Sequence, residues 1–74
     1  MIKNQKKLDE LARLEGKDLE EVLEIATFDS VAASICTNPG CTYTTTLEPD
    51  QEHGYCEVCG TNTVASCLVL AGIL

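Results

Sequence analysis

The sequence predicts a small α+β domain with a helical hairpin first, a β-hairpin second and a short apolar helix or strand at the C-terminal end. Three observations predict this fold class. Apolar residues recur at helical spacing in the first third, β-branched and aromatic residues fill a run in the middle, and two short cysteine motifs flank that run. We expect residues 1–35, the helical hairpin with its connector, and residues 36–74 to pack as one compact unit.

The first helix is expected over residues 3–15. Its apolar positions, Leu8, Leu11 and Ala12, recur at helical spacing. Gly16 follows, at a position where helices commonly end in a left-handed residue.

The second helix is expected to begin at Leu19, after a capping box in which Asp18 accepts from the backbone and Glu21 reaches back. Its buried stripe consists of Leu19, Val22, Leu23 and Ala26. Residues 28–35 are small and mixed in character, and we expect a connector there, with or without one further helical turn.

Residues 42–47 are rich in threonine and predict a strand. One face of that strand is expected to carry Tyr43, Thr45 and Leu47. Residues 48–54 supply the turn of a hairpin, so a return strand from Tyr55 is expected to pair with the first strand.

The C-terminal run 63–74 is apolar nearly throughout. A short buried helix is favoured and a strand is the alternative, because short apolar runs do not show their period. Its 12 residues fall well below the roughly 20 that a membrane-spanning helix needs, so no membrane partner is expected. Residues 1–7 lead into a charged amphipathic stretch and not into an apolar signal segment, so a cytoplasmic protein is expected.

Four of the five cysteines have the spacing of metal ligands. Cys36 and Cys41 enclose four residues. Cys56 and Cys59 enclose two residues, and 14 residues separate the two pairs. The odd number of cysteines and the expected cytoplasmic location favour thiolate ligation over disulfides. The sequence therefore predicts a metal-bound domain with one structural Zn²⁺ per chain, closed to catalysis because four thiolates leave no open ligand position.

The alternatives to a structural zinc site concern the metal itself, His53 and the fifth cysteine. Four thiolates also hold iron, so a rubredoxin-like site is the chief alternative, and the longer first motif argues against it. His53 lies between the cysteine motifs and is expected to be a solvated turn residue. The fifth cysteine, Cys67, is expected to be a small buried hydrophobe.

The cysteine motifs and the hairpin between them resemble the zinc-ribbon fold group over about residues 36–64. Three phrases look more narrowly similar to a group of short, uncharacterised bacterial and phage zinc-ribbon proteins. These phrases are Cys36-Thr37-Asn38-Pro39-Gly40-Cys41, Glu48-Pro49-Asp50-Gln51 and Cys59-Gly60-Thr61-Asn62-Thr63-Val64. The resemblance implies a zinc site and a ribbon fold, and it transfers no activity.

The functional expectation is a protein-interaction or adaptor module that is not an enzyme, because no constellation of acid, base and nucleophile accompanies the closed site. The partner is expected to be another protein or a second copy of the chain. The residues expected to make this contact are Val64, Leu68, Val69, Ile73 and Leu74. One alternative is an iron electron carrier.

The other alternative is a nucleic-acid-associated, transcription-type zinc ribbon. Zinc ribbons often serve nucleic-acid machines, and four positions match a helix-turn-helix pattern, namely Ala12, Gly16, Val22 and Ile25. The net charge of −7 disfavours this alternative, as does the absence of cations in the second helix. The basic residues are expected on the solvated face of the first helix: Lys3, Lys6, Lys7, Arg13 and Lys17.

Overall fold

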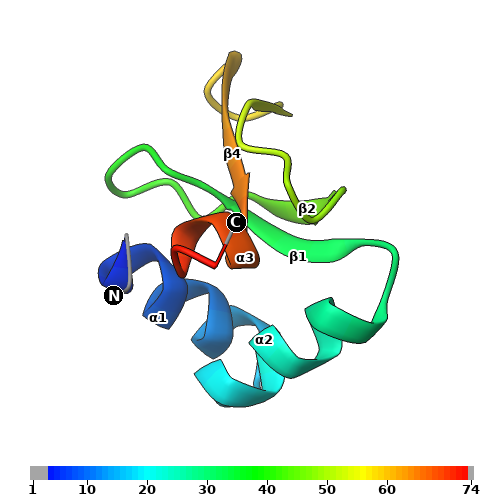
Figure 1. Ribbon diagram of the computed structural model, residues 1–74. Coiled ribbons are helices and arrows are strands. Elements are labelled where there is room, and N and C mark those ends of the chain that lie inside the picture. The colour runs from blue at the N-terminus through cyan, green and yellow to red at the C-terminus, as the bar shows by residue number, and fades with distance from the viewer. Residues whose placement is uncertain (1–3, 74) are drawn as a thin grey trace.

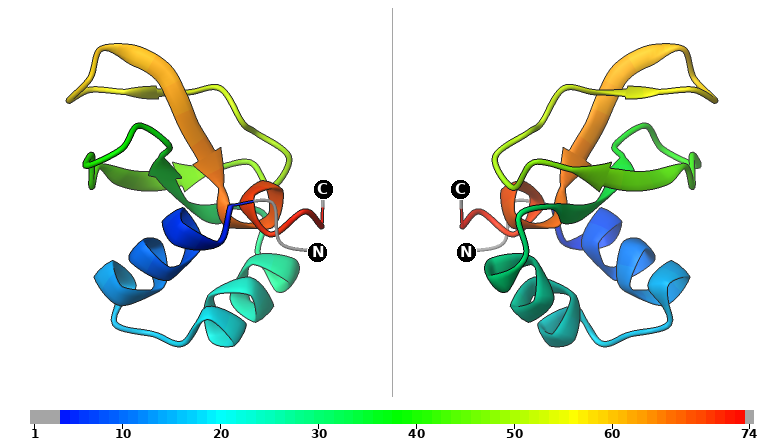
Figure 2. Two further views of the ribbon diagram at one scale, coloured as in Figure 1. Left: turned by 90° about the vertical axis from the view of Figure 1, so that its left-hand side faces the viewer. Right: turned by 90° about the vertical axis from the view of Figure 1, so that its right-hand side faces the viewer.

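The computed structural model describes residues 4–73 and has the small α+β fold that the sequence predicts. Within these residues, three helices accompany a four-stranded antiparallel sheet (Figure 1). The elements in chain order are α1 Gln5–Glu15, α2 Leu19–Phe28, β1 Ala32–Cys36, β2 Thr44–Leu47, β3 Gly54–Cys56, β4 Thr61–Ser66 and α3 Cys67–Leu70. The longer helices, α1 and α2, lie on one side of β1 and β2, and the hairpin of β3 and β4 lies on the other (Figure 2).

Helix α1 begins and ends where local chemistry places its caps. The Asn4 side chain accepts from the Lys7 N–H at 3.2 Å, which satisfies one of the free donors of the first turn. Gly16 ends the helix with φ of 71°, a left-handed conformation that glycine adopts without steric cost. All three apolar residues of the predicted stripe are buried, which confirms this helix.

Helix α2 begins at Leu19, as expected. Val22 and Ala26 are buried, and Leu19 and Leu23 pack against them from partly buried positions, so the predicted stripe is confirmed. The predicted capping box is wrong in its first half, because the Asp18 side chain makes no capping hydrogen bond.

The connector expected at residues 28–35 is wrong for its second half, which belongs to strand β1. Ala32–Cys36 is a central strand that pairs with β2 on one side and β4 on the other. Alanine and serine have low strand propensity, so residues 32–34 carry no local strand signal. Their small side chains instead suit a buried strand under a layer of helices, and pairing with two neighbours fixes the conformation.

The expected hairpin between residues 42–47 and a strand from Tyr55 is wrong in its pairing. Strand β2 is present, and its half-buried face carries Tyr43, Thr45 and Leu47, as predicted. Strand β2 pairs with β1, however, and β3 pairs with β4, in the sheet order β2-β1-β4-β3. The two strands therefore lie at opposite edges of the sheet, and residues 48–53 cross between them. Each cysteine motif is instead the turn of its own hairpin.

The apolar C-terminal run divides into both of the elements considered for it. Its first residues complete β4, and residues 67–70 form the one-turn helix α3. The strand ends and the helix begins at Ser66, because its side-chain Oγ accepts from the Val69 N–H at 3.2 Å and caps α3.

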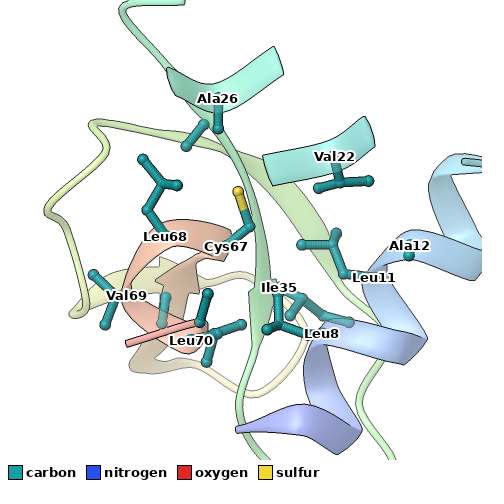
Figure 3. Packing of buried hydrophobic residues seen from close by; sticks show 13 residues of the cluster. Leu8, Leu11, Ala12, Val22, Ala26, Ile35, Cys67, Leu68, Val69 and Leu70 are labelled. Atoms are coloured by element: carbon teal, nitrogen blue, oxygen red, sulfur yellow. The ribbon is translucent and has the colours of Figure 1, made fainter. Parts of the chain in front are cut away.

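The buried side chains form two clusters. The larger one lies between the helices and β1, and its residues include Leu8, Leu11, Val22, Ile35 and Leu68 (Figure 3). The smaller one consists of Cys36, Cys56 and Val64, with partly buried Cys41, Tyr43 and Leu47 packed against it. Ile35 and Cys36 are neighbours in β1 and belong to different clusters. The expected boundary between the helical part, residues 1–35, and the cysteine part, residues 36–74, therefore falls within a strand.

Candidate metal centre

The four predicted ligands come from two equivalent hairpin turns. Cys36 is the last residue of β1, and Cys41 lies in the turn that leads to β2. Cys56 is the last residue of β3, and Cys59 lies in the turn that leads to β4. Strand β4 pairs with both β1 and β3, and this shared partner brings the two turns together.

The sulfur positions fit a tetrahedral metal ion. All four Sγ atoms lie within 4.8 Å of one another. The Cys36 and Cys59 sulfurs are 3.9 Å apart, and the Cys41 and Cys56 sulfurs are 3.7 Å apart. A tetrahedral shell with Zn–S bonds of about 2.3 Å requires S···S distances of roughly 3.8 Å. A disulfide requires about 2.05 Å, so these pairs are arranged as ligands and not as disulfides.

Backbone hydrogen bonds hold each turn in this shape. In the second turn, the Cys59 N–H donates to Cys56 Sγ at 3.3 Å, and the Gly60 N–H donates to the Cys56 carbonyl at 2.8 Å. Gly60 has φ of 71°, which glycine adopts freely. In the first turn, the Cys41 N–H donates to the Asn38 carbonyl at 3.1 Å.

A group of hydroxyl and amide side chains lies next to Cys36. The Thr63 Oγ1 atom lies 3.1 Å from Cys36 Sγ and 3.1 Å from Thr61 Oγ1. The Thr63 carbonyl accepts from both the N–H and the hydroxyl of Thr37, each at 2.8 Å. These bonds tie the first turn to β4. This role of Thr63 was not expected from the sequence, where its position in the phrase after Cys59 is the available signal.

The pKa values of Cys36 and Cys41 shift in opposite directions. Burial raises the pKa of Cys36, but hydrogen bonds from the Thr63 side chain, the Asn38 backbone and neighbouring thiols outweigh burial and bring the pKa to about 7. For Cys41, a hydrogen bond from the Tyr43 backbone lowers the pKa, but burial and the other three sulfurs raise it to about 12. Cys36 therefore loses its proton more easily than Cys41 does, and four thiolates held this close together need a cation to offset their repulsion.

Lys7 connects helix α1 to the first turn and corrects the expected solvated position. Its side chain is only 4 % exposed, and its Nζ donates to the Cys41 carbonyl at 2.8 Å. Glu10 Oε1 lies 3.6 Å from the same Nζ. Lys7 precedes Leu11 by four residues, so it lies on the buried face of α1. That spacing was the available signal for a buried cation next to the cysteine cluster.

His53 and Cys67 lie outside the cysteine cluster. The His53 side chain is exposed and lies 3.6 Å from a Glu52 carboxylate oxygen, as expected for a turn residue. Cys67 is fully buried in the larger cluster, where burial raises the pKa of its thiol. The prediction that Cys67 acts as a small buried hydrophobe is confirmed.

The residues expected to contact a partner are mostly buried within this chain. Val64, Leu68 and Val69 are core residues, and each is at most 4 % exposed. Ile73 is 57 % exposed, and Leu74 lies outside the described residues. The sequence indicated that part of this apolar run would remain on the surface. In the structure, α3 packs against both longer helices, and Val64 of β4 is buried in the smaller cluster.

Comparison with protein families, with curated proteins and with solved structures found no match for this chain. The fold and the site define its class, which is a small α+β protein with four clustered cysteines that can hold a metal ion. Within residues 4–73, no helix has both the length and the apolar character needed to cross a membrane.

Proposed function

We propose that this chain is a zinc-ribbon-like module whose single Zn²⁺ stabilises the fold so that the protein can bind another protein. The observation that carries the proposal is the closed sulfur cluster. Four thiolates at tetrahedral distances complete the coordination of zinc and leave no position for water or substrate. The longer first motif, with four residues between its cysteines, favours zinc over a rubredoxin-like iron site.

The composition of the smaller buried cluster supports a structural role for the metal. Cys36, Cys56 and Val64 are its only fully buried members within residues 4–73, and two of these three are ligands. Without a metal, that half of the protein has almost no apolar core. Structural zinc contributes about 10–16 kcal/mol of apparent binding free energy in small zinc fingers, and that free energy becomes folding free energy when the metal-free site is disordered.

An exposed apolar surface at the end of α2 supports protein binding. Phe28 is 84 % exposed, and Ile25, one helical turn earlier on the same face, is 41 % exposed. Val31, just before β1, is also exposed. Clustered exposed apolar side chains on a small soluble domain usually mark an interaction surface. This surface takes the place of the C-terminal residues that the sequence indicated.

The charges on α2 argue against nucleic-acid binding. Residues 18–29 carry five exposed carboxylates and no lysine or arginine. Ile25 is also partly exposed, whereas the helix-turn-helix pattern requires an aliphatic residue in the core at that position. A major groove lined by phosphates would repel this helix.

Native mass spectrometry of freshly purified protein, with and without chelator, tests the proposal. We expect one zinc per chain and an assembly with another protein or a second copy that is lost on chelation. A Cys67→Ala variant serves as the control, because it leaves all four ligands in place and should keep its zinc. Bound iron would indicate electron transfer instead, and a metal-free disulfide form would contradict the proposal.

A further inference from the structure

We infer that an extended basic peptide segment binds along the outer edge of β2 and places one apolar side chain in a groove beside α2. This inference rests on the proposed function and names the chemistry of the partner. An unprotected strand edge, an apolar groove and a one-sided distribution of charge meet at this place.

Strand β2 is an edge strand without the usual protection. It is the first strand in the sheet order, so none of the strands within residues 4–73 pairs with its outer side. Thr44–Leu47 contains no charged residue and no proline, which are the common means of blocking an edge. Threonine also favours the extended conformation. An extended peptide can therefore add to this edge by backbone hydrogen bonds.

The opposite edge of the sheet is a poorer candidate. Strand β3 has only three residues, and its pairing with β4 is irregular between Gly54 and Cys56. Such an irregularity disturbs the regular row of backbone groups that a peptide would need.

The groove lies next to the unprotected edge. It has a volume of about 150 Å³. Its apolar lining consists of Val22, Ile25, Ala26, Val31 and Ala33. Thr46 of β2 also lines it and pairs with Ala33, so the two side chains share the sheet face beside the helices. Alternate residues of a strand added to β2 would point to that same face. An apolar cavity of about 150 Å³ accommodates one benzene molecule, so this groove has room for one apolar side chain.

The charges around the groove favour a basic partner over a second copy. Glu15 and Asp29 line the groove with a single cation, Lys17. Beyond the groove, α2 carries more exposed carboxylates, namely Glu20, Glu21 and Glu24. The chain has a net charge of −7, so two copies would repel each other at this surface, whereas lysine or arginine side chains on a peptide would be attracted.

Three nine-residue synthetic peptides test this inference against ¹⁵N-labelled, zinc-loaded protein. The first alternates lysine and valine, the second replaces each lysine with glutamate, and the third replaces each valine with serine. We expect the lysine–valine peptide to shift amide signals of β2, Ala33 and the end of α2. The other two peptides should bind at least about tenfold more weakly, because each lacks one of the two interactions.

Charge variants of the protein give the matched control. Thr46→Lys and Asp29→Lys each place a cation beside the groove at an exposed position. Each should weaken binding of the lysine–valine peptide by about tenfold. Glu57→Lys changes the net charge by the same amount as Asp29→Lys, but it lies in the second cysteine turn, and it should leave binding within about twofold.

The outcomes separate this inference from the proposed function. The inference would be overturned if the lysine–valine peptide caused no shifts at β2 and the groove. It would also be overturned if Glu57→Lys weakened peptide binding as much as Asp29→Lys does. Tighter binding of the glutamate peptide, or self-association through β2, would show that the partner is not a basic peptide. Either result would leave the proposed interaction module intact. A chain that binds no zinc would instead overturn the proposed function.

Discussion

Replacing Lys7 with methionine tests how helix α1 supports the metal centre. The Lys7 ammonium group is buried and donates to the carbonyl of Cys41, one of the four clustered cysteines. Methionine keeps most of the apolar stem and removes the charge and the donor, so packing against the core is largely preserved. The change therefore removes the bond between α1 and the first cysteine turn together with the ion pair between Lys7 and Glu10.

The expected effect is the difference between two opposing contributions. A hydrogen bond with a charged donor contributes about 1.5–3 kcal/mol, and its 2.8 Å length is typical of such a bond. Removing a buried ammonium also relieves its desolvation cost, which offsets part of this loss. We expect Lys7→Met to lower the free energy of unfolding of the zinc-loaded protein by about 1–2 kcal/mol. Part of this loss should appear as zinc affinity weakened by about threefold to tenfold, because the bond ends on a ligand residue.

Urea unfolding and zinc competition against a colorimetric chelator measure these two quantities. Lys6→Met is the matched control, because Lys6 precedes Lys7 in α1 and is exposed. The control should change stability by no more than about 0.5 kcal/mol. Equal unfolding midpoints and equal zinc affinities for the two variants would refute the role assigned to Lys7.

Three further predictions concern other contacts near the two clusters. Gly54→Ala should destabilise the protein by about 1–3 kcal/mol in urea unfolding, because its Cβ would lie 2.6 Å from a Leu47 methyl carbon; an unchanged midpoint would contradict this. Thr63→Val should weaken zinc binding by about 10-fold to 100-fold in chelator competition, because it removes the hydroxyl that lies 3.1 Å from Cys36 Sγ; wild-type affinity would argue against this contact. Burial raises the pKa of the Cys67 thiol, so the folded protein keeps this proton to higher pH than the unfolded chain does. Its contribution to stability is complete below the unfolded thiol's pKa of about 8.5 and is lost as pH rises towards the folded value. Stability measured across this range should therefore fall less in Cys67→Ala than in the wild type, and equal slopes would contradict the assignment.

The parts of the structure that sequence predicts well depend on local signals. Helix α1 follows from the spacing of Leu8 and Leu11 and from the glycine at its end. The cysteine cluster follows from spacing as well, because a short turn between two cysteines leaves few ways to arrange their sulfurs. These features need no knowledge of which strand pairs with which.

The parts that sequence missed depend on contacts between distant residues. Strand β1 has weak local propensity and forms because β2 and β4 pair with it on both sides. Lys7 is buried only because α1 packs against the first cysteine turn, 34 residues away in sequence. Leu68 and Val69 were interpreted as surface, since an apolar run does not reveal which other elements cover it. In each case the missing information is tertiary.

We propose that one Zn²⁺, held by Cys36, Cys41, Cys56 and Cys59, stabilises the fold. A chelator titration followed by ¹H–¹⁵N correlation spectra tests it most directly. We expect the dispersed amide signals of β3 and β4 to collapse as zinc is removed and to return when one equivalent of Zn²⁺ per chain is added. Dispersed β3 and β4 signals that persist after complete removal of the metal would contradict it.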